Sequence, residues 1–399
     1  MKKRTSKQQA HRGSRLGKAV QADAWLLVPV LLLLAVGLVM VGSSSIAIAE
    51  SNGVSASHYL VRHVIYIVLG LLLAFSFRGI PVAALEKISQ PLIWLSALLL
   101  LLVFIPGLGH SVNGSARWIS LGFVNFQVVE AVKVMVIIYM AGYLVRKSDR
   151  VRTRFFDTLK PLLLAGMLTA LLLMQPDLGS AAVITAIVGG MIWLAGAAWR
   201  HLFLLAMMAA PVFGVAAMEP YRLKRIISFM DPWQDPFNSG FQLTQALIAV
   251  GRGEVFGVGL GASIQKLFYL PEAHTDFIFA VLAEEFGLLG VIFILALFML
   301  LVTRIMVIGL VAHRAGRPFA GNVAYGIGLW IGLQALVSIG VNLGVLPTKG
   351  LTLPLISSGG SSVLMTLLAL GIVFRIRYEL DYEARFRAAG VTNMPGARR

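Results

Sequence analysis

The stretch PEAHTDFIFAVLAEEFGLLG (271–290) places carboxylates at the start of, and inside, a long apolar run. Asp276 stands just before the run, and Glu284 and Glu285 lie inside it, at a depth where lipid would reject a free charge. Ionisable residues within a membrane are costly and commonly mark a functional site or a substrate path. The stretch therefore predicts a membrane helix whose outer end carries chemistry.

The composition of the whole chain supports a membrane protein. Its 399 residues are 58% hydrophobic and 13% charged, with a mean hydropathy of +0.83, whereas an average soluble domain has about 25% charged residues. The chain has no cysteine, which excludes disulfides, a thiolate nucleophile and a cysteine-ligated metal. We expect one helical membrane domain.

Ten segments approach the about 20 apolar residues that a membrane-spanning helix needs. All should be helices, because an open strand edge leaves backbone groups unsatisfied in lipid. The sequence thus predicts an all-α integral membrane protein with ten transmembrane helices. The predicted spans are 25–47, 59–77, 90–106, 128–145, 161–175, 180–198, 201–218, 277–302, 323–345 and 360–376.

The predicted domains are a basic cytoplasmic tail over 1–24, a membrane domain over 25–376 and a cytoplasmic C-terminal tail over 377–399. The membrane domain includes one long extracytoplasmic loop over 219–276. Ala47-Ile48-Ala49 resembles a signal-peptidase site. We expect no cleavage there, because the preceding apolar run with its flanks is long enough to span a membrane.

The distribution of Lys and Arg predicts the orientation. With the N-terminus inside, 25 of the 34 basic residues fall on the cytoplasmic side, as the positive-inside rule requires. Both termini are then cytoplasmic, and the net charge of +16 is mostly a topology signal with some attraction to anionic lipid. Nucleic acid is not an expected partner. Basic residues also occur in the outer segments 107–127, 219–276 and 346–359, which indicates a role for cations outside.

Asp276 has two interpretations that the residues alone leave open. As a general base at the outer membrane surface, it would take a proton from a hydroxyl group. As a helix cap, it would satisfy backbone N–H groups at the start of the eighth span, and Thr275 beside it could do the same. His274 is a weaker candidate, because a histidine at a loop end is commonly solvated or a hydrogen-bond partner.

The other buried charges favour structural roles. Glu284 lies roughly 12 Å deeper than Asp276 along the helix, and we expect Glu284 or Glu285 to join a polar network rather than catalyse. Glu130 and Lys133 are spaced for an ion pair on one helix face, or alternatively line the same cavity as Asp276. Asp177 is best placed to cap the next helix, although it could also face that cavity.

Several outer cations suit a phosphate-bearing substrate, because they can stabilise charge on a leaving phosphate. Contact with lipid headgroups is the alternative. Trp118 could stack on a sugar or a lipid group, or anchor the chain at the membrane interface. The cations concerned are Arg117, Arg222, Lys224, Arg225 and Lys349.

Two glycine-rich stretches invite a phosphate-binding interpretation. GVGLG (257–261) follows no predicted strand and is more typical of a tight backbone turn than of a nucleotide loop. SSGGSS (357–362) should open the tenth helix, and its free N–H groups could bind an anion such as pyrophosphate.

Four motifs resemble the SEDS family of shape, elongation, division and sporulation proteins. They match in order over about residues 24–380, and they resemble the cell-division branch more than the elongation branch. Where the family commonly has QPSE, this chain has Gln127-Val128-Val129-Glu130, and Ser358 stands where a tyrosine is frequent. The motifs are NGSARWISLG (113–122), QPDLGSA (175–181), GRGEVFGVGLGASIQKLFYLPEAHTDFIFAVLAEEFG (251–287) and PTKGLTLPLISSGGSS (347–362).

This resemblance implies a peptidoglycan glycosyltransferase that polymerises lipid II, a disaccharide-pentapeptide on undecaprenyl pyrophosphate, for septal wall synthesis. It implies that Asp276 is the catalytic base and that Arg117 and Lys349 belong to family motifs of the site. Outer cations, or a divalent metal ion such as Mg²⁺ or Mn²⁺, would stabilise the leaving pyrophosphate. A class B penicillin-binding protein and other division proteins are the implied partners, at the septum of the bacterial inner membrane.

Two other classes of function stay open on the sequence. A lipid II flippase would also bury charges within many spans, although we find no inverted repeat of the kind many transporters have. A non-catalytic division scaffold would use the tails and outer loops to bind partners. Substitution of Asp276 should stop an enzyme, whereas a flippase should depend more on Glu284 and Glu285.

Overall fold

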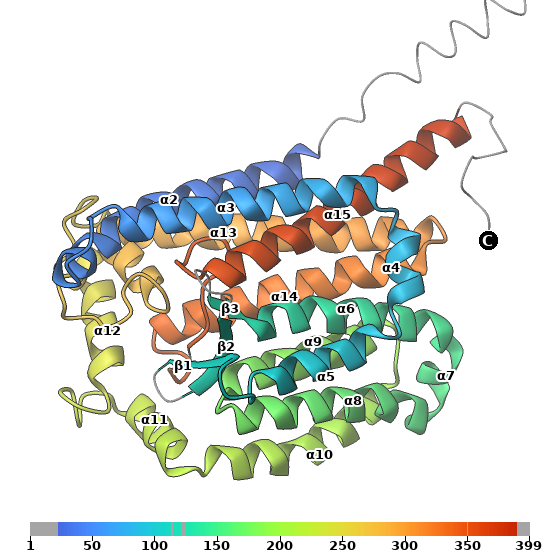
Figure 1. Cartoon of the computed structure of the whole chain (residues 1–399), viewed down its shortest axis with the longest axis horizontal. Coiled ribbons are helices and arrows are strands. Elements are labelled where there is room, and N and C mark those ends of the chain that lie inside the picture. The colour runs from blue at the N-terminus through green and yellow to red at the C-terminus, as the bar shows by residue number, and fades with distance from the viewer. Residues whose placement is uncertain (1–22, 113–114, 121–124, 349, 389–399) are drawn as a thin grey trace, which may run out of the picture.

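The protein is a bundle of long, mostly antiparallel helices with one small sheet (Figure 1). The structure, a computed structural model, describes residues 23–112, 115–120, 125–348 and 350–388. The helices of the first half are α2 (Ala24–Ser51), α3 (His58–Ser76), η1 (Phe77–Gly79), α4 (Val82–Ile88), α5 (Leu92–Leu102), α6 (Val128–Arg146), α7 (Ser148–Thr153) and α8 (Phe155–Met174). The second half has α9 (Leu178–Leu194), α10 (Trp199–Ala217), α11 (Pro220–Met230), α12 (Phe241–Gly253), α13 (Ile278–Arg314), α14 (Pro318–Asn342) and α15 (Gly360–Ala388).

The ten predicted spans all coincide with apolar helices, and the multi-pass membrane architecture is confirmed. Six described helices are long and apolar enough to cross a membrane, namely α2, α3, α6, α8, α13 and α14. The bent pair α4 and α5, which meet at 69°, would be a seventh; the predicted span 90–106 corresponds to α5, which is shorter than expected. The count of ten spans stays a prediction.

Two outer segments contain more regular structure than the sequence predicted. Within 107–127, strands β1 (Gly109–Val112), β2 (Ser115–Ser120) and β3 (Asn125–Gln127) form an antiparallel sheet in the order β1-β2-β3. Ile119 pairs with Gly109 on one side and Phe126 on the other. Within the predicted loop 219–276, α11 and α12 are helices. We call the end of the bundle where the sheet, α11, α12 and segment 343–359 lie the loop end (Figure 1).

The opposite end is held by ion pairs, and we call it the tail end. Asp23, before α2, bonds to Arg304 of α13 at 2.6 Å and to Arg377 of α15 at 3.2 Å. Arg317, before α14, bonds to Glu379 at 2.5 Å and also to Glu383. These contacts tie helices that are distant in sequence, while the last turns of α15 extend beyond the bundle (Figure 1).

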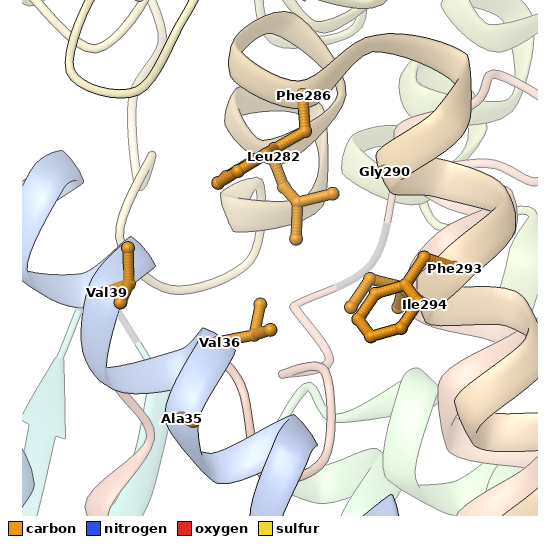
Figure 2. Close-up of a pocket in the computed structure, with 8 residues that line it drawn as sticks. All are labelled: Ala35, Val36, Val39, Leu282, Phe286, Gly290, Phe293 and Ile294. Atoms are coloured by element: carbon orange, nitrogen blue, oxygen red, sulfur yellow. The ribbon is translucent and has the colours of Figure 1, made fainter.

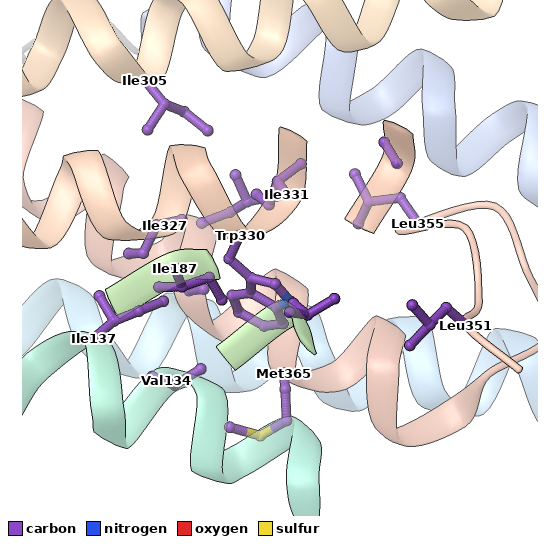
Figure 3. Close-up of a cluster of buried hydrophobic side chains, with 14 of the residues drawn as sticks. Val134, Ile137, Ile187, Ile305, Ile327, Trp330, Ile331, Leu351, Leu355 and Met365 are labelled. Carbon is purple, nitrogen blue, oxygen red and sulfur yellow. The ribbon is translucent and has the colours of Figure 1, made fainter. Parts of the chain in front are cut away.

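The core lies where α6, α9, α13, α14 and α15 meet (Figure 3). Trp330 of α14 is the largest side chain in it, at 1% exposure, and its Nε1 donates to Gln334 Oε1 at 2.7 Å. The aliphatic side chains around it, including Ile137 and Ile187, exclude water and fix the helices beneath the loop end. The core therefore packs directly beneath the segments of the loop end.

Candidate functional site

Asp276 lies at the loop end, just before the first turn of α13. The N-cap residue of α13 is Phe277, and its side chain makes no capping hydrogen bond. The capping interpretation of Asp276 is therefore wrong. In the part of the chain that the structure describes, the Asp276 carboxylate makes no hydrogen bond and no ion pair.

Asn342, at the end of α14, supplies the cap instead. Its Oδ1 accepts a hydrogen bond from the Ala280 N–H at 2.9 Å, and its Nδ2 donates to the Asp276 carbonyl at 2.9 Å. The sequence analysis missed this residue. The only available signal was an asparagine within the predicted apolar span 323–345, where a polar side chain needs a partner.

Segment 350–359 packs directly against the backbone beside Asp276. Ser357 Oγ donates to the Thr275 carbonyl at 2.7 Å, and the Ser358 N–H donates to the His274 carbonyl at 3.0 Å. A Cβ added at Gly350 would lie 3.2 Å from Asp276 Oδ2, so this segment approaches the carboxylate itself. The segments 271–276 and 350–359, distant in sequence, thus form one wall of the site.

The surroundings of Asp276 shift its acidity toward neutrality. Burial and the nearby Glu272 carboxylate raise the pKa of Asp276 to about 7, against the lowering effects of Arg117 and Arg225, and Asp177 adds a further raising effect. A general base works best when its pKa is close to the operating pH. The raised pKa of Asp276 is in the range that a general base at neutral pH would need.

Arg117 connects the sheet to the turn between α8 and α9. On β2, it donates from Nη2 to the Pro176 carbonyl at 2.6 Å, and its Nε lies 3.9 Å from Asp177 Oδ2. Asp177 caps α9 as predicted, accepting from the Ser180 N–H at 3.1 Å and from Ser180 Oγ at 2.7 Å. One guanidinium and one carboxylate from separate segments are thereby brought within electrostatic reach of Asp276.

The other predicted cations are less closely placed. Arg225 of α11 donates to the Thr348 carbonyl at 3.4 Å and acts electrostatically on Asp276. Lys224, also on α11, acts instead on Asp235, whose pKa is lowered mainly by hydrogen bonds from Ser239. Arg222 lies on α11, but its side chain is outside the described part. Lys349 also lies outside the described residues.

Trp118 and His274 are held by contacts of their own. Trp118 is half-buried on β2, where its backbone pairs with His110 and Gln127. His274 packs its ring 5.1 Å from the ring of Tyr59 on α3, and burial lowers its pKa. A neutral His274 near pH 7 is consistent with the lesser role that the sequence suggested for it.

The Glu130–Lys133 pair forms as predicted and supports the site from below. Lys133 Nζ lies 2.8 Å from Glu130 Oε1 and 2.7 Å from Gln334 Oε1. Gln334 Nε2 in turn donates to the Thr352 carbonyl at 3.0 Å. The pair therefore acts through Gln334 to hold segment 350–359 rather than lining the wall beside Asp276.

Glu284 and Glu285 are both paired, as the sequence predicted for at least one. Glu284 bonds to Arg252 Nη1 and to Ser263 Oγ, each at 2.5 Å. Glu285 Oε1 bonds to Lys266 Nζ and to Ser43 Oγ, each at 2.7 Å. The sequence shows Arg252 and Lys266 only as basic residues of the outer segment 219–276, because pairing with residues so distant in sequence leaves no local pattern.

A break in α13 follows these two glutamates, and the sequence did not predict it. Gly287 has φ 63° and ψ −162°, which interrupts the helical hydrogen bonds. Residues 253–259, which we call the strap, replace them. Val258 and Gly259 N–H donate to the Glu284 and Glu285 carbonyls. In return, the Leu288 and Leu289 N–H groups donate to the carbonyls of strap residues 254 and 255.

The glycines of the strap explain how it fits. Gly257 and Gly259 of the strap, and Gly261 just after it, all have positive φ, which confirms the tight turn predicted for GVGLG. A Cβ at Gly257 would lie 2.2 Å from the Glu285 carbonyl oxygen, so any larger residue would push the strap away from α13.

A groove between α2 and α13 is lined by residues from both sides of the break (Figure 2). Its volume is about 240 Å³, and its lining is Ala35, Val36, Val39, Leu282, Phe286, Gly290, Phe293 and Ile294. These side chains offer no polar group to a sugar or a phosphate. The polar chemistry is therefore gathered at the loop end around Asp276.

No group of three or more His, Asp or Glu among the described residues is arranged to hold a metal ion. The carboxylates near Asp276 are separate rather than clustered. The described residues therefore offer no cluster that would hold a metal by itself, and Arg117 and Arg225 are the described cations that act on Asp276.

Comparisons with known proteins agree with this architecture. The family model described as cell cycle protein, for FtsW, RodA and SpoVE, matches residues 24–382. The probable peptidoglycan glycosyltransferase FtsW of Coxiella burnetii is 50% identical over 360 residues, covering 90% of this chain and 97% of that protein. The protein with the same description from Nitrosococcus halophilus is 50% identical over 372 residues, covering 93% and 95%.

Solved structures show the same fold. A chain of a peptidoglycan synthase complex, studied for the coordination of polymerization and crosslinking, is 32% identical with a TM-score of 0.73, covering 92% of this chain and 99% of that one. The Thermus thermophilus rod shape determining protein RodA is 30% identical with a TM-score of 0.66 and the same coverage.

Proposed function

We propose that this chain, which belongs to the FtsW, RodA and SpoVE family of cell cycle proteins, is a peptidoglycan glycosyltransferase with Asp276 as its base. Relatives described by that activity are about half identical to it over nearly their whole length. The observation that carries the role of Asp276 is its carboxylate at the loop end, which makes no hydrogen bond or ion pair with another described residue and has its pKa raised to about 7.

The substrate we propose is lipid II, as donor and as acceptor. Asp276 would take the proton of the acceptor GlcNAc 4-hydroxyl while that oxygen attacks C1 of the donor MurNAc. The bond from C1 to the pyrophosphate oxygen breaks, and undecaprenyl pyrophosphate leaves with the electron pair. Direct displacement converts the α-linked donor to a β-linkage. One base suffices, because a pyrophosphate leaves without protonation.

Arg117 and Arg225 are the cations best supported for the leaving pyrophosphate, because both act electrostatically at Asp276. Arg222, Lys224, Lys349 and Trp118 stay proposed contacts of the sugar or the pyrophosphate. No step is assigned to a divalent metal ion, because the described carboxylates and histidines form no cluster to hold one.

The proposed setting is the bacterial inner membrane at the division septum, with both termini in the cytoplasm. The loop end would then face the periplasmic side, where the growing glycan strand lies. A class B penicillin-binding protein is the proposed partner. A similar chain has been solved in a peptidoglycan synthase complex, which supports such an assembly.

A lipid II flippase fits less well. That function would place Glu284 and Glu285 on the path of the substrate, but both are buried and bonded to Arg252 and Lys266. A scaffold without catalysis would leave no reason for a carboxylate of raised pKa at the loop end. The glycosyltransferase therefore has the stronger support.

The test is polymerisation of purified lipid II by the full chain with its transpeptidase partner. We expect Asp276→Ala to lower the rate by roughly 10²–10⁴-fold, the usual contribution of a general base. Asp235→Asn is a matched control. Asp235 is an acidic residue of the same outer region, and its carboxylate accepts hydrogen bonds from the nearby Asn238 and Ser239 side chains. Glycan from a folded, partner-binding Asp276→Ala variant at the wild-type rate would remove Asp276 from the mechanism.

A further inference from the structure

We infer that Asn342 is a positioning residue, which orients Asp276 by capping α13 from the end of α14. The inference rests on the proposed function, since it concerns the base of that reaction. Asn342 does not reach the outer surface of the site, because its side chain is fully buried. Its effect on the reaction would pass through the backbone of Asp276.

The amide of Asn342 uses its acceptor and both donor directions. Oδ1 accepts from the Ala280 N–H, while Nδ2 donates to the Asp276 carbonyl at 2.9 Å and to the Ser338 carbonyl at 2.8 Å. A helix start leaves its first N–H groups without partners, and a side chain commonly accepts from one of them. Here that side chain comes from another helix.

The contact completes a pattern along the backbone before α13. The carbonyls of three consecutive residues, 274, 275 and 276, accept from Ser358 N–H, Ser357 Oγ and Asn342 Nδ2. The first two donors lie in segment 350–359, and Asn342 ends the helix that leads into it. The backbone of Asp276 is thus held on both sides, and its carboxylate is spared from capping.

This division of roles explains how Asp276 can serve as a base. A carboxylate that caps a helix accepts backbone hydrogen bonds, which stabilise its ionised form and lower its pKa. Asn342 takes those bonds instead, so that burial dominates and the pKa of Asp276 rises to about 7. The direction of the carboxylate is fixed at the same time.

Two substitutions separate the two halves of the contact. Asn342→Asp keeps an acceptor for the Ala280 N–H but loses the donor to the Asp276 carbonyl, and an ionised carboxylate there adds negative charge beside Asp276. Asn342→Leu has a similar shape and loses both bonds. Ser338→Ala is the matched control, because Ser338 is one turn away on α14, is also buried and has no partner for its hydroxyl among the described residues.

The experiment measures lipid II polymerisation against pH for these variants in complex with the transpeptidase partner, together with melting temperature and partner binding. We expect Asn342→Leu to lower kcat by about 10–10²-fold with little change in KM, because the base is misplaced but the substrate contacts remain. Asn342→Asp should lower kcat and also move the acidic limb of the profile to higher pH, because a like charge disfavours ionisation of Asp276. Ser338→Ala should behave as wild type.

A second readout needs no activity. Hydrogen exchange of peptides covering 277–283 should become faster in Asn342→Leu, which removes one of the two acceptors of the Ala280 N–H and leaves only the Phe277 carbonyl at 3.1 Å, and should stay slow in Asn342→Asp. Wild-type kcat, pH profile and exchange in both folded variants would overturn the inference, while Asp276→Ala would still test the proposed function. Absence of glycan from wild type would reject the proposed function, and the exchange data would still decide whether Asn342 caps α13.

Discussion

The two halves of α13 have similar apolar sequences but different surroundings. The short half, 278–286, is buried on nearly every side, with Asp276 just before it and Glu284 and Glu285 at its end. The long half, 288–314, turns many large side chains outward, among them Leu289 and Met299. The short half is held at both ends by other segments, whereas the long half is held by packing along one face. The difference shows that an apolar run can be divided into a part that positions chemistry and a part that faces lipid.

The sharpest test of the short half is the pH dependence of polymerisation. Because Asp276 must be ionised to act as a base and its pKa is about 7, the rate should fall about tenfold for each pH unit below 7. The measurement is the initial rate between pH 5 and 9 with the partner present. A rate that stays flat down to pH 5 would break the comparison, because the end of the short half would then carry no titrating base.

The Asp276 carboxyl should affect folding stability in the opposite direction from the rate, because stability should fall as pH rises. A carboxyl with a raised pKa binds its proton more tightly when the protein is folded, so its stabilising contribution is largest at low pH and is lost as pH rises from about 4 to about 7. Asp276→Asn removes this titration. The difference in melting temperature between wild type and Asp276→Asn should therefore vary with pH across that window and be constant above it.

The next largest effect should come from the ion pair at the end of the short half. Lys266→Met leaves Glu285 buried without its cation, and breaking a buried pair in this way costs about 3–5 kcal/mol of unfolding free energy. Denaturant or thermal unfolding in detergent measures the loss. The double variant Lys266→Met with Glu285→Leu should recover much of it, because no unpaired charge remains. Equal losses in both would show that packing, not charge, holds this end.

A smaller effect should follow from Gly287→Ala at the boundary between the halves. The φ of 63° and ψ of −162° suit glycine, and a new Cβ would lie 2.4 Å from the Gly257 nitrogen. We expect a loss of about 1–3 kcal/mol and faster hydrogen exchange in the strap. Gly332→Ala on α14 is the control, because its Cβ would meet only ordinary contacts at 3.5 Å. No change in unfolding free energy for Gly287→Ala would mean that the backbone at the break does not need the glycine conformation.

The smallest effect should occur in the long half. Met299 is 70% exposed on α13, so Met299→Leu changes few contacts within the protein. We expect a change in stability within roughly 0.5 kcal/mol and no change in polymerisation. A loss comparable to that of Lys266→Met would indicate that this face packs against a partner rather than lipid.

The sequence predicted those features that depend on local patterns. Apolar segments of sufficient length marked every long helix, and spacing along one helix marked the Glu130–Lys133 pair. The position of Asp177 after a proline marked its capping role. In each case the interacting groups lie within a few residues, so their geometry follows from the helix alone.

The features that it missed depend on contacts between distant segments. Gly287 resembles any glycine in an apolar helix until the strap is placed against it, and the pairing of Lys266 with Glu285 needs the path of the loop between them. The three short strands of 109–127 lack the alternating pattern of longer ones. The alternatives for Asp276 stayed open for the same reason, because the residue that caps α13 lies 62 positions beyond Ala280.

The strap constrains how this protein can change in evolution. Two of its N–H groups and two of its carbonyls bond to the backbone groups on the two sides of the break in α13. Adding or deleting one residue between 255 and 258 would therefore put the two sets of bonds out of register and leave buried backbone groups without partners. The turn over 231–240, which is exposed and bonds mainly within itself, has no such requirement. Homologous chains should therefore vary in length at that turn, while the strap keeps a fixed number of residues.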